Sequence, residues 1–183
     1  MGSASRTAQL RHRAAGKVEP AAIARRLGSV VHWPGAAEVR ERTWRVVAQT
    51  PDYDAWLIAW PTGGTIDLHD HGDSRGALHV ISGTLVETMP WRDDADRLSL
   101  VRLEVPAGVT RDFDAGHVHD VRNEGSVAAL SVHVYSPPLT SMLYYDCFED
   151  RLVPRERAWT DVDAGGTATS LLSDQPALHL VAR

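Results

Sequence analysis

The sequence is poor in cysteine, and this limits the sites that it can build. Cys147 is the only cysteine in the chain. One thiol cannot form a disulfide within the chain, and it cannot supply the cysteine clusters that hold many structural metals. Any metal site must therefore use nitrogen or oxygen ligands, and the nine histidines are the natural supply.

Long apolar runs and excess positive charge are also missing. No apolar stretch reaches the length of a membrane-spanning helix, and the first residues lack the apolar core of a signal peptide. The net charge of −5 disfavours nucleic acid and anionic membranes as partners. We therefore expect a cytoplasmic protein that is a monomer or weak homodimer and has neither nucleic acid nor membrane as a partner.

The remaining composition is that of a globular domain with a short appendage at each end. Hydrophobic residues make up 43% and charged residues 23%, enough to bury a core. Residues 1–42 are predicted to be a helical or irregular N-terminal segment, with a short helix over Glu19–Leu27 that Gly28 ends. Residues 43–147 are predicted to be a barrel, and residues 148–183 a C-terminal extension that packs on it, with a last strand at Leu178–Val181.

From residue 43 onward, short β-type runs alternate with Pro, Gly, Asp and Asn. Many short strands with little helix between them favour an antiparallel sandwich or barrel. The predicted strands are Thr43–Gln49, Ala55–Trp60, Thr65–His71, Ala77–Ile81, Thr84–Thr88, Leu98–Val105, Val109–Phe113, Val118–Arg122, Ala128–Tyr135 and Met142–Asp146. Pro90–Arg97 is predicted to be a polar loop.

Two motifs of glycine and histidine lie on these strands. The first reads Gly63-x5-His69-x-His71-x4-Gly76-x6-Gly83, and the second reads Gly108-x5-Asp114-x-Gly116-x2-His119-x3-Asn123. Successive strand residues point to opposite faces, so a His-x-His pair sends both imidazoles to the same side. Both motifs resemble those of the cupin superfamily, in the order found there. Most metal-binding cupins have glutamate where this chain has Gly76.

The cupin resemblance implies an all-β fold, a double-stranded β-helix or jelly-roll barrel, in which His69, His71 and His119 bind one metal ion. Without a carboxylate at Gly76 all ligands are neutral, so a divalent ion keeps its full charge. Such a site favours an anionic substrate, and a thiolate is a good candidate. Nitrogen ligands also suit zinc, copper and nickel, and zinc with three histidines is the main alternative to iron.

A second polar cluster lies near the end of the barrel segment, in the run ALSVHVYSPP. Period-2 alternation puts Ser131, His133 and Tyr135 on one face of a strand. On an inner face these groups would need hydrogen-bond partners, whereas an outward polar face would not. The alternation alone leaves both placements open.

The Ser-x-His-x-Tyr pattern and the Ser136-Pro137-Pro138 that follows it resemble the thiol dioxygenases, and the cysteine dioxygenase type I family most closely. The resemblance covers roughly residues 40–147 and is densest in Trp60–Glu87 and Gly116–Asp146. It implies one mononuclear Fe(II) ion, a relay that places the tyrosine hydroxyl beside the iron, and a cis Ser136–Pro137 bond.

The resemblance also bears on the tyrosine and on the substrate pocket. Animal members have a cysteine at the position of Gly76, and it crosslinks to the tyrosine. Because Gly76 has no thiol and Cys147 is distant in sequence, Tyr135 should be a free phenol, as in a bacterial type without the crosslink. Met142 aligns with a wall of the family's substrate pocket, although a core position is an equally good interpretation.

A substrate carboxylate would need a cation, which family members supply from an arginine on an early strand. In the run RERTWRVVAQ the preferred candidate is Arg45, and Arg42 is the alternative. The related 3-mercaptopropionate dioxygenases typically have glutamine in that role, and Gln49 lies close enough in sequence to keep this option open.

The resemblance thus implies an enzyme that adds both atoms of O2 to a small thiol, most simply L-cysteine, to give cysteine sulfinate. Oxidation of 3-mercaptopropionate is the nearest alternative. A metal cupin that is not an oxygenase, either an isomerase or a sensor or binding protein, is the alternative from another class.

Overall fold

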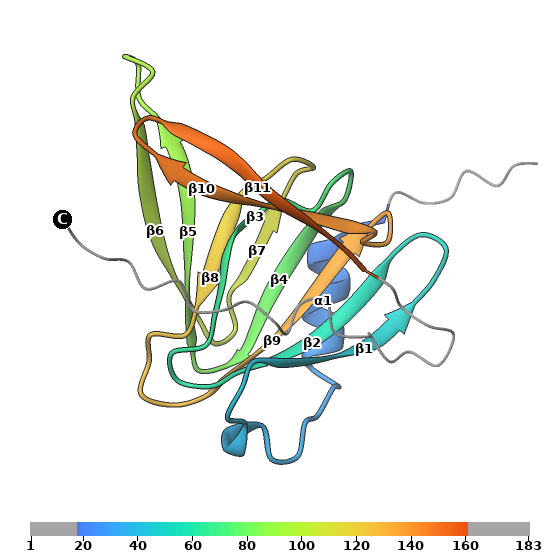
Figure 1. The fold of residues 1–183 in the computed structure, drawn as a ribbon. Helices are drawn as coiled ribbons and strands as arrows, with labels where there is room; N and C mark the ends of the chain where they lie inside the picture. The colour runs from blue at the N-terminus through green and yellow to red at the C-terminus, as the bar shows by residue number, and fades with distance from the viewer. Residues whose placement is uncertain (1–17, 161–183) are drawn as a thin grey trace, which may run out of the picture.

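The computed structural model describes residues 18–160, which form two antiparallel sheets with one short helix against them (Figure 1). The elements, in chain order, are α1 (Pro20–Gly28), the 3-10 turn η1 (Ala36–Glu38), β1 (Thr43–Gln49), β2 (Asp54–Trp60), β3 (Thr65–His69), β4 (Arg75–Ser82), β5 (Thr84–Arg92), β6 (Leu98–Pro106), β7 (Thr110–Phe113), β8 (His119–Arg122), β9 (Ala129–Ser136), β10 (Ser141–Phe148) and β11 (Arg151–Trp159).

The two sheets follow the topology of a cupin barrel. One sheet has the strand order β1-β2-β9-β4-β7, and the other has the order β11-β10-β3-β8-β5-β6. Most neighbouring strands are therefore non-consecutive in the chain, as in a double-stranded β-helix. The predicted all-β cupin fold is confirmed.

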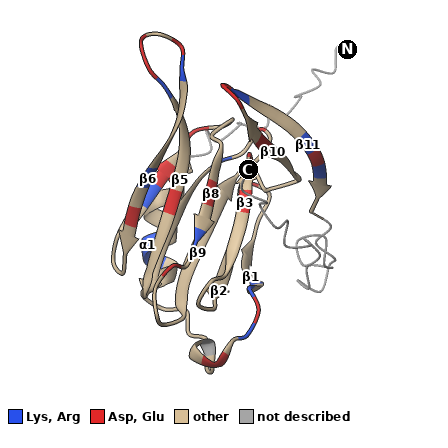
Figure 2. Ribbon diagram, turned by 60° about the vertical axis from the view of Figure 1, so that its left-hand side comes forward, with Lys and Arg blue, Asp and Glu red and all other residues tan. Residues whose placement is uncertain are grey.

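At the centre of the first sheet, β2 and β9 are buried on both faces. Inward residues of β2, such as Trp56, Ile58 and Trp60, join the core between the sheets. Outward residues of the same strand, such as Leu57, pack against α1 through side chains that include Ala24. The distribution of charged residues reflects this burial (Figure 2). β9 carries no Lys, Arg, Asp or Glu, whereas β11 carries residues of both signs.

Several predicted boundaries are wrong, and one strand was missed. β5 extends to Arg92, so the first three residues of the predicted loop over Pro90–Arg97 belong to the strand. β11 was not predicted, because Pro154 and several charges break its apolar pattern. Within residues 18–160 it is an edge strand that pairs with β10 alone, and an edge position tolerates proline and charge. Leu178–Val181 lies outside the described residues.

No helix within residues 18–160 combines the length and the apolarity needed to cross a lipid bilayer.

A buried acid marks the start of β2. Asp54 is only 3% exposed, and its Oδ2 accepts a hydrogen bond from the backbone N–H of Leu139, at 3.2 Å. This contact ties β2 to the segment after the Ser136–Pro137 bond, which is cis as predicted. Burial raises the pKa of Asp54 from its ordinary 3.8 to about 6.

This raised pKa predicts a specific pH dependence of stability. Between the unfolded pKa of 3.8 and the folded pKa of about 6, the folded state binds more protons than the unfolded chain. The contribution of Asp54 to the free energy of unfolding therefore falls as pH rises through this range, by ~3 kcal/mol in all. In urea titrations Asp54→Asn should gain stability relative to the wild type between pH 4 and pH 7. The exposed neighbour Asp52, changed to Asn, is the control, and parallel curves for Asp54→Asn and the wild type would contradict the prediction.

Candidate metal centre

Three histidines meet on the inner face of the second sheet. His69 ends β3 and pairs directly with His119 at the start of β8, and His71 follows two residues after His69. The ring centroids lie 4.8 Å (His69–His71), 4.9 Å (His69–His119) and 5.0 Å (His71–His119) apart. One ligand nitrogen from each ring lies within 4.8 Å of the others, and all three side chains are buried. The structure thus brings together the three residues predicted as ligands, and their role stays a prediction.

The hydrogen bonds of these rings suit metal binding. Nδ1 of His69 donates to the carbonyl oxygen of Asp67, and Nδ1 of His119 donates to Oε1 of Glu87, each at 2.7 Å. A ring whose Nδ1 carries the proton keeps the Nε2 lone pair free for a metal. Within the described residues, both ring nitrogens of His71 are buried and accept or donate no hydrogen bond. Coordination of an ion would satisfy one of these otherwise costly groups.

The charge state of the rings points the same way. Burial lowers the pKa of all three imidazoles below the usual 6.5, and well below it for His69 and His71. Neutral imidazole is the form that coordinates metals. The residues present therefore fit a divalent ion held by three neutral nitrogen donors.

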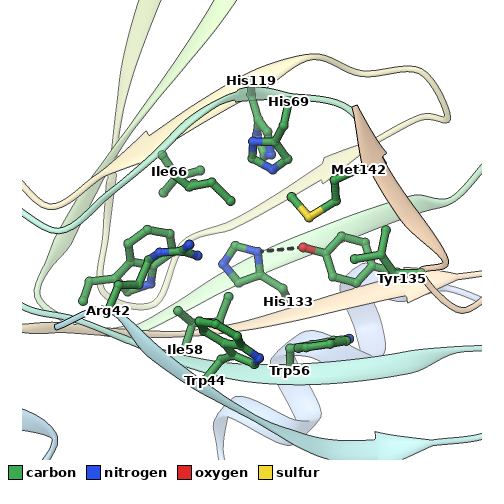
Figure 3. A pocket seen from close by; sticks show the side chains of 13 residues that line it. Arg42, Trp44, Trp56, Ile58, Ile66, His69, His119, His133, Tyr135 and Met142 are labelled. Carbon is green, nitrogen blue, oxygen red and sulfur yellow. Dashed lines mark hydrogen bonds between the residues drawn. The ribbon is translucent and has the colours of Figure 1, made fainter. Parts of the chain in front are cut away.

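Ser131, His133 and Tyr135 face this cluster from β9, so the inward of the two placements left open by the sequence is the one found. His133 lies between the other two, with Nε2 at 3.0 Å from Ser131 Oγ and Nδ1 at 3.4 Å from the Tyr135 hydroxyl (Figure 3). The indole N–H of Trp60 donates to Ser131 Oγ at 2.9 Å. Burial lowers the pKa of His133 to about 3 and raises the pKa of Tyr135 far above its usual value.

A cavity joins the histidine cluster to the relay. Its wall is mostly aromatic and aliphatic, and its polar lining groups are one arginine, three histidines and one tyrosine. The lining residues are Arg42, Trp44, Trp56, Ile58, Trp60, Ile66, His69, His119, Val121, His133, Tyr135, Leu139 and Met142. Met142, predicted as a pocket wall, is among them.

The arginine in the cavity is Arg42, and the preference for Arg45 was wrong. Trp44 faces the core from β1, so strand alternation turns Arg45 to the outer face. There Arg45 is exposed, donates to the backbone carbonyl of His32 and lies over the Trp33 ring. Arg42 comes just before the strand and reaches inward, with its guanidinium carbon 5.5 Å from the ring centroids of both Trp44 and Trp60 (Figure 3).

Gln49, the other option for binding a substrate carboxylate, does not line the cavity either. It is exposed at the end of β1.

Comparison with known proteins assigns the chain to a family. The family model for cysteine dioxygenase type I matches residues 32–147, which is more than half of the sequence and includes every residue of the site. The chain belongs to the cysteine dioxygenase type I family.

Individual relatives of this cysteine dioxygenase family member share only low sequence identity with it. The type 1 cysteine dioxygenases of Bos taurus and Mus musculus are each 26% identical to it over 102 residues, which is 51% of this chain and 50% of theirs. The chain thus spans about half the length of the curated relatives it matches.

Two solved structures are reported among those similar to this chain. A Klebsiella pneumoniae protein with a double-stranded β-helix domain has a TM-score of 0.42 and 24% identity, over 54% of this chain and 78% of its own. An oxalate oxidase in complex with the substrate analogue glycolate has a TM-score of 0.47 and 18% identity, over 58% of this chain and 56% of its own.

Gly76 has no room for a side chain. A Cβ atom there would lie 2.5 Å from the carbonyl oxygen of Val134 and 2.6 Å from Cζ of Phe113. Phe113 pairs with Gly76 across β4 and β7, and its ring stacks on His71 at 4.8 Å. The single cysteine of this chain, Cys147, is exposed on β10.

Sequence reasoning missed three residues of this family member's site: Trp60 as a hydrogen-bond donor, Phe113 and Glu87. Trp60 and Phe113 carry no sequence signal beyond an apolar strand position. Glu87 does carry one, because alternation places it on the same inward face as the buried Leu85. A carboxylate at an inward position needs a partner, and that partner is His119.

The crowding at Gly76 predicts the effect of the smallest possible side chain. Gly76→Ala should lower the free energy of unfolding by ~1–3 kcal/mol, because either β9 or the Phe113 ring must move. Adding Phe113→Leu should recover only part of the loss, since the backbone carbonyl of Val134 remains in the way. Gly125→Ala is the milder comparison, because its nearest contact is at 3.2 Å with a side-chain atom of Asn123, and it should lose less stability than Gly76→Ala. Urea denaturation measures all four proteins, and equal stability of Gly76→Ala and wild type would refute the argument.

Proposed function

We propose that the protein is a mononuclear iron thiol dioxygenase that converts L-cysteine and O2 to cysteine sulfinate. The observation that carries the proposal is the cavity itself, where two of the three clustered imidazoles, a buried tyrosine relay and a single arginine line one apolar space. Membership of the cysteine dioxygenase type I family supports the same activity.

His69, His71 and His119 would hold the metal. A bound Fe(II) ion would supply a binding position for the thiolate and for O2. Because the three ligands are neutral, the site keeps the ion's positive charge and attracts an anion such as a thiolate. The indole and aliphatic walls exclude water, which strengthens each electrostatic contact inside.

Arg42 would bind the carboxylate of the substrate. Burial lowers the pKa of its guanidinium, yet arginine keeps its charge in proteins. A guanidinium fork binds a carboxylate through two parallel hydrogen bonds. The flanking rings of Trp44 and Trp60 hold the cation in place through cation–π contacts. The substrate carboxylate would therefore bind at one defined position in the cavity.

Tyr135 would donate a hydrogen bond to the reacting groups. The indole of Trp60 can only donate, so Ser131 Oγ accepts from it, and in the proposed relay the Ser131 hydroxyl donates its hydrogen to Nε2 of His133. Nδ1–H of His133 then donates to the Tyr135 oxygen, and the phenolic hydrogen points into the cavity. In this series of hydrogen bonds each group donates to the next one towards the substrate. The raised pKa of Tyr135 keeps the phenol protonated.

The overall reaction is balanced without another reductant. The sulfur of RSH gains both oxygen atoms to become RSO2H, so it loses four electrons while O2 takes up four. The protein therefore needs only to bind the thiol, orient it and keep water out.

A specific feature favours 3-mercaptopropionate as a second candidate substrate. No aspartate or glutamate stands among the described residues that line the cavity, so the wall offers no counter-ion to a free ammonium group. A thiol with a carboxylate and no amine would meet no unpaired charge there. Cysteine would need its amine bound at the metal position.

The test of the proposal is a direct assay. The protein is loaded with Fe(II) under anaerobic conditions, and O2 uptake and sulfinate are measured with L-cysteine, 3-mercaptopropionate or cysteamine. We expect one O2 consumed per sulfinate formed, with a carboxylate thiol preferred over cysteamine. No uptake with any thiol rejects the dioxygenase and favours a metal cupin of another class, while preference for 3-mercaptopropionate reassigns the substrate.

The two arginines provide a matched pair of variants. Arg42→Gln should lower kcat/KM for carboxylate thiols by roughly 10- to 150-fold, because a charge-assisted hydrogen bond contributes about 1.5–3 kcal/mol. Its kcat/KM for cysteamine, which has no carboxylate, should change far less. Arg45→Gln, on the outer face, should match the wild type with every thiol. Equal losses in both variants, or an equal loss for cysteamine in Arg42→Gln, would show that Arg42 does not bind the carboxylate.

A further inference from the structure

Glu87 lies buried in the middle of β5, behind the histidine cluster and outside the cavity. Its side chain is 1% exposed, and Glu87 lies opposite Val121 of the neighbouring strand β8. Burying a carboxylate in a barrel wall costs several kcal/mol unless its oxygens are well bonded. The position therefore calls for strong partners, and the structure supplies three.

The three partners occupy both carboxylate oxygens. Oε1 accepts from Nδ1 of His119 at 2.7 Å and from Nε2 of His117 at 3.2 Å, and Oε2 accepts from Nε of Arg111 at 3.0 Å. Arg111 balances the negative charge. Burial opposes ionisation of Glu87, but these hydrogen bonds outweigh it and lower its pKa well below the usual 4.5.

The contact with His119 makes the three candidate ligands unequal. Nδ1 of His69 donates to a neutral backbone carbonyl, and His71 has no such partner among the described residues. Only His119 donates to an anion. A carboxylate behind an imidazole fixes the tautomer and the ring orientation and raises the basicity of the other nitrogen.

The surroundings of Glu87 hold it still. Arg111 reaches it from β7 with a side chain that is 36% exposed, and fixes the second oxygen. His117 covers the first oxygen, and its ring stacks on Phe113 at 5.4 Å with 16° between the planes. Phe113 in turn stacks on His71, so a packed row runs from the carboxylate through His117 and Phe113 to a second candidate ligand, His71.

We propose that Glu87 is a positioning residue that locks His119 with Nδ1 protonated and strengthens it as a metal ligand. The carboxylate that Gly76 does not supply to the metal is thereby present one hydrogen bond further out. This inference rests on the proposed metal role of the three histidines, but it does not depend on the reaction.

The first test is metal affinity. Apo-protein is titrated with Co²⁺ in competition with a chromophoric chelator, and the ligand-field absorption of Co²⁺ is recorded. Glu87→Gln keeps the shape of the side chain and removes its charge, so we expect a Kd higher by roughly 10- to 100-fold and a shifted spectrum. The stoichiometry should stay at one ion per chain.

The matched control is Asp120→Asn. Asp120 is a buried carboxylate next to His119 in sequence, but its oxygen pairs with Arg122 rather than with a ligand histidine. This variant removes a nearby charge and leaves the ligand contacts intact, so its Co²⁺ Kd should stay within about threefold of wild type, well below the loss typical of a ligand's hydrogen-bond partner. An equal loss of Co²⁺ affinity in both variants would show that Glu87 acts only through its charge or through overall stability, and not through its contact with His119.

A second measurement covers the case in which Glu87→Gln does not fold. In the Zn²⁺-loaded wild type, ¹⁵N–¹H spectra of the imidazoles should show a proton on Nδ1 of His119, shifted downfield and slow to exchange. Coordination through Nδ1 of His119, an unchanged Co²⁺ Kd and spectrum in Glu87→Gln, or a second bound ion on Glu87 and His117 would each overturn the inference. Absence of O2 uptake with an intact effect on Co²⁺ affinity would instead reject the proposed reaction and leave the positioning role standing.

Discussion

The structure depends on one constraint: a barrel interior must satisfy every polar group that it encloses. The interior of this barrel encloses three imidazoles, a serine–histidine–tyrosine series and two carboxylates, all nearly inaccessible to water. Except for His71, whose ring nitrogens have no hydrogen bond among the described residues, each has a hydrogen-bond partner, and several of these partners come from other strands. His119 on β8 is held by Glu87 on β5, and Ser131 on β9 is held by Trp60 on β2. The hydrogen bonds therefore define the strand register as much as the site.

The two sheets contribute different parts of the chemistry. The second sheet carries the candidate metal ligands, because the pairing of β3 with β8 sets His69 directly opposite His119. The first sheet carries the relay on β9, in its centre between β2 and β4. Helix α1 and its neighbours cover the outer face of this sheet, so β9 is apolar outward and polar inward. A rigid, doubly covered strand is a suitable support for groups that must keep their orientation.

Charge inside the barrel is kept in separate places. Arg42 lies in the cavity, where an anionic substrate would meet it, while Glu87 and Arg111 form their pair behind the histidines. Because the anionic group stands one hydrogen bond away from the metal position, the cavity itself has no carboxylate among the described residues. This separation suits a site that must attract a small anion and still hold a divalent ion firmly.

The sequence by itself predicted an all-β fold from its many short strands, and its resemblance to the cysteine dioxygenase type I family implied the cupin fold, the family and the cis Ser136–Pro137 bond, all of which are confirmed. The same resemblance implied the three candidate ligand histidines and the Ser131–His133–Tyr135 relay, but only the structure placed that relay on the inner face. Only the tertiary structure decided between Arg42 and Arg45, placed Phe113 over Gly76 and set Glu87 behind His119. It also added β11, an edge strand whose proline and charges resemble a loop. These features depend on which residues face each other across strands distant in sequence. A shift of one residue in register would turn every side chain to the other face, and no local pattern fixes that register.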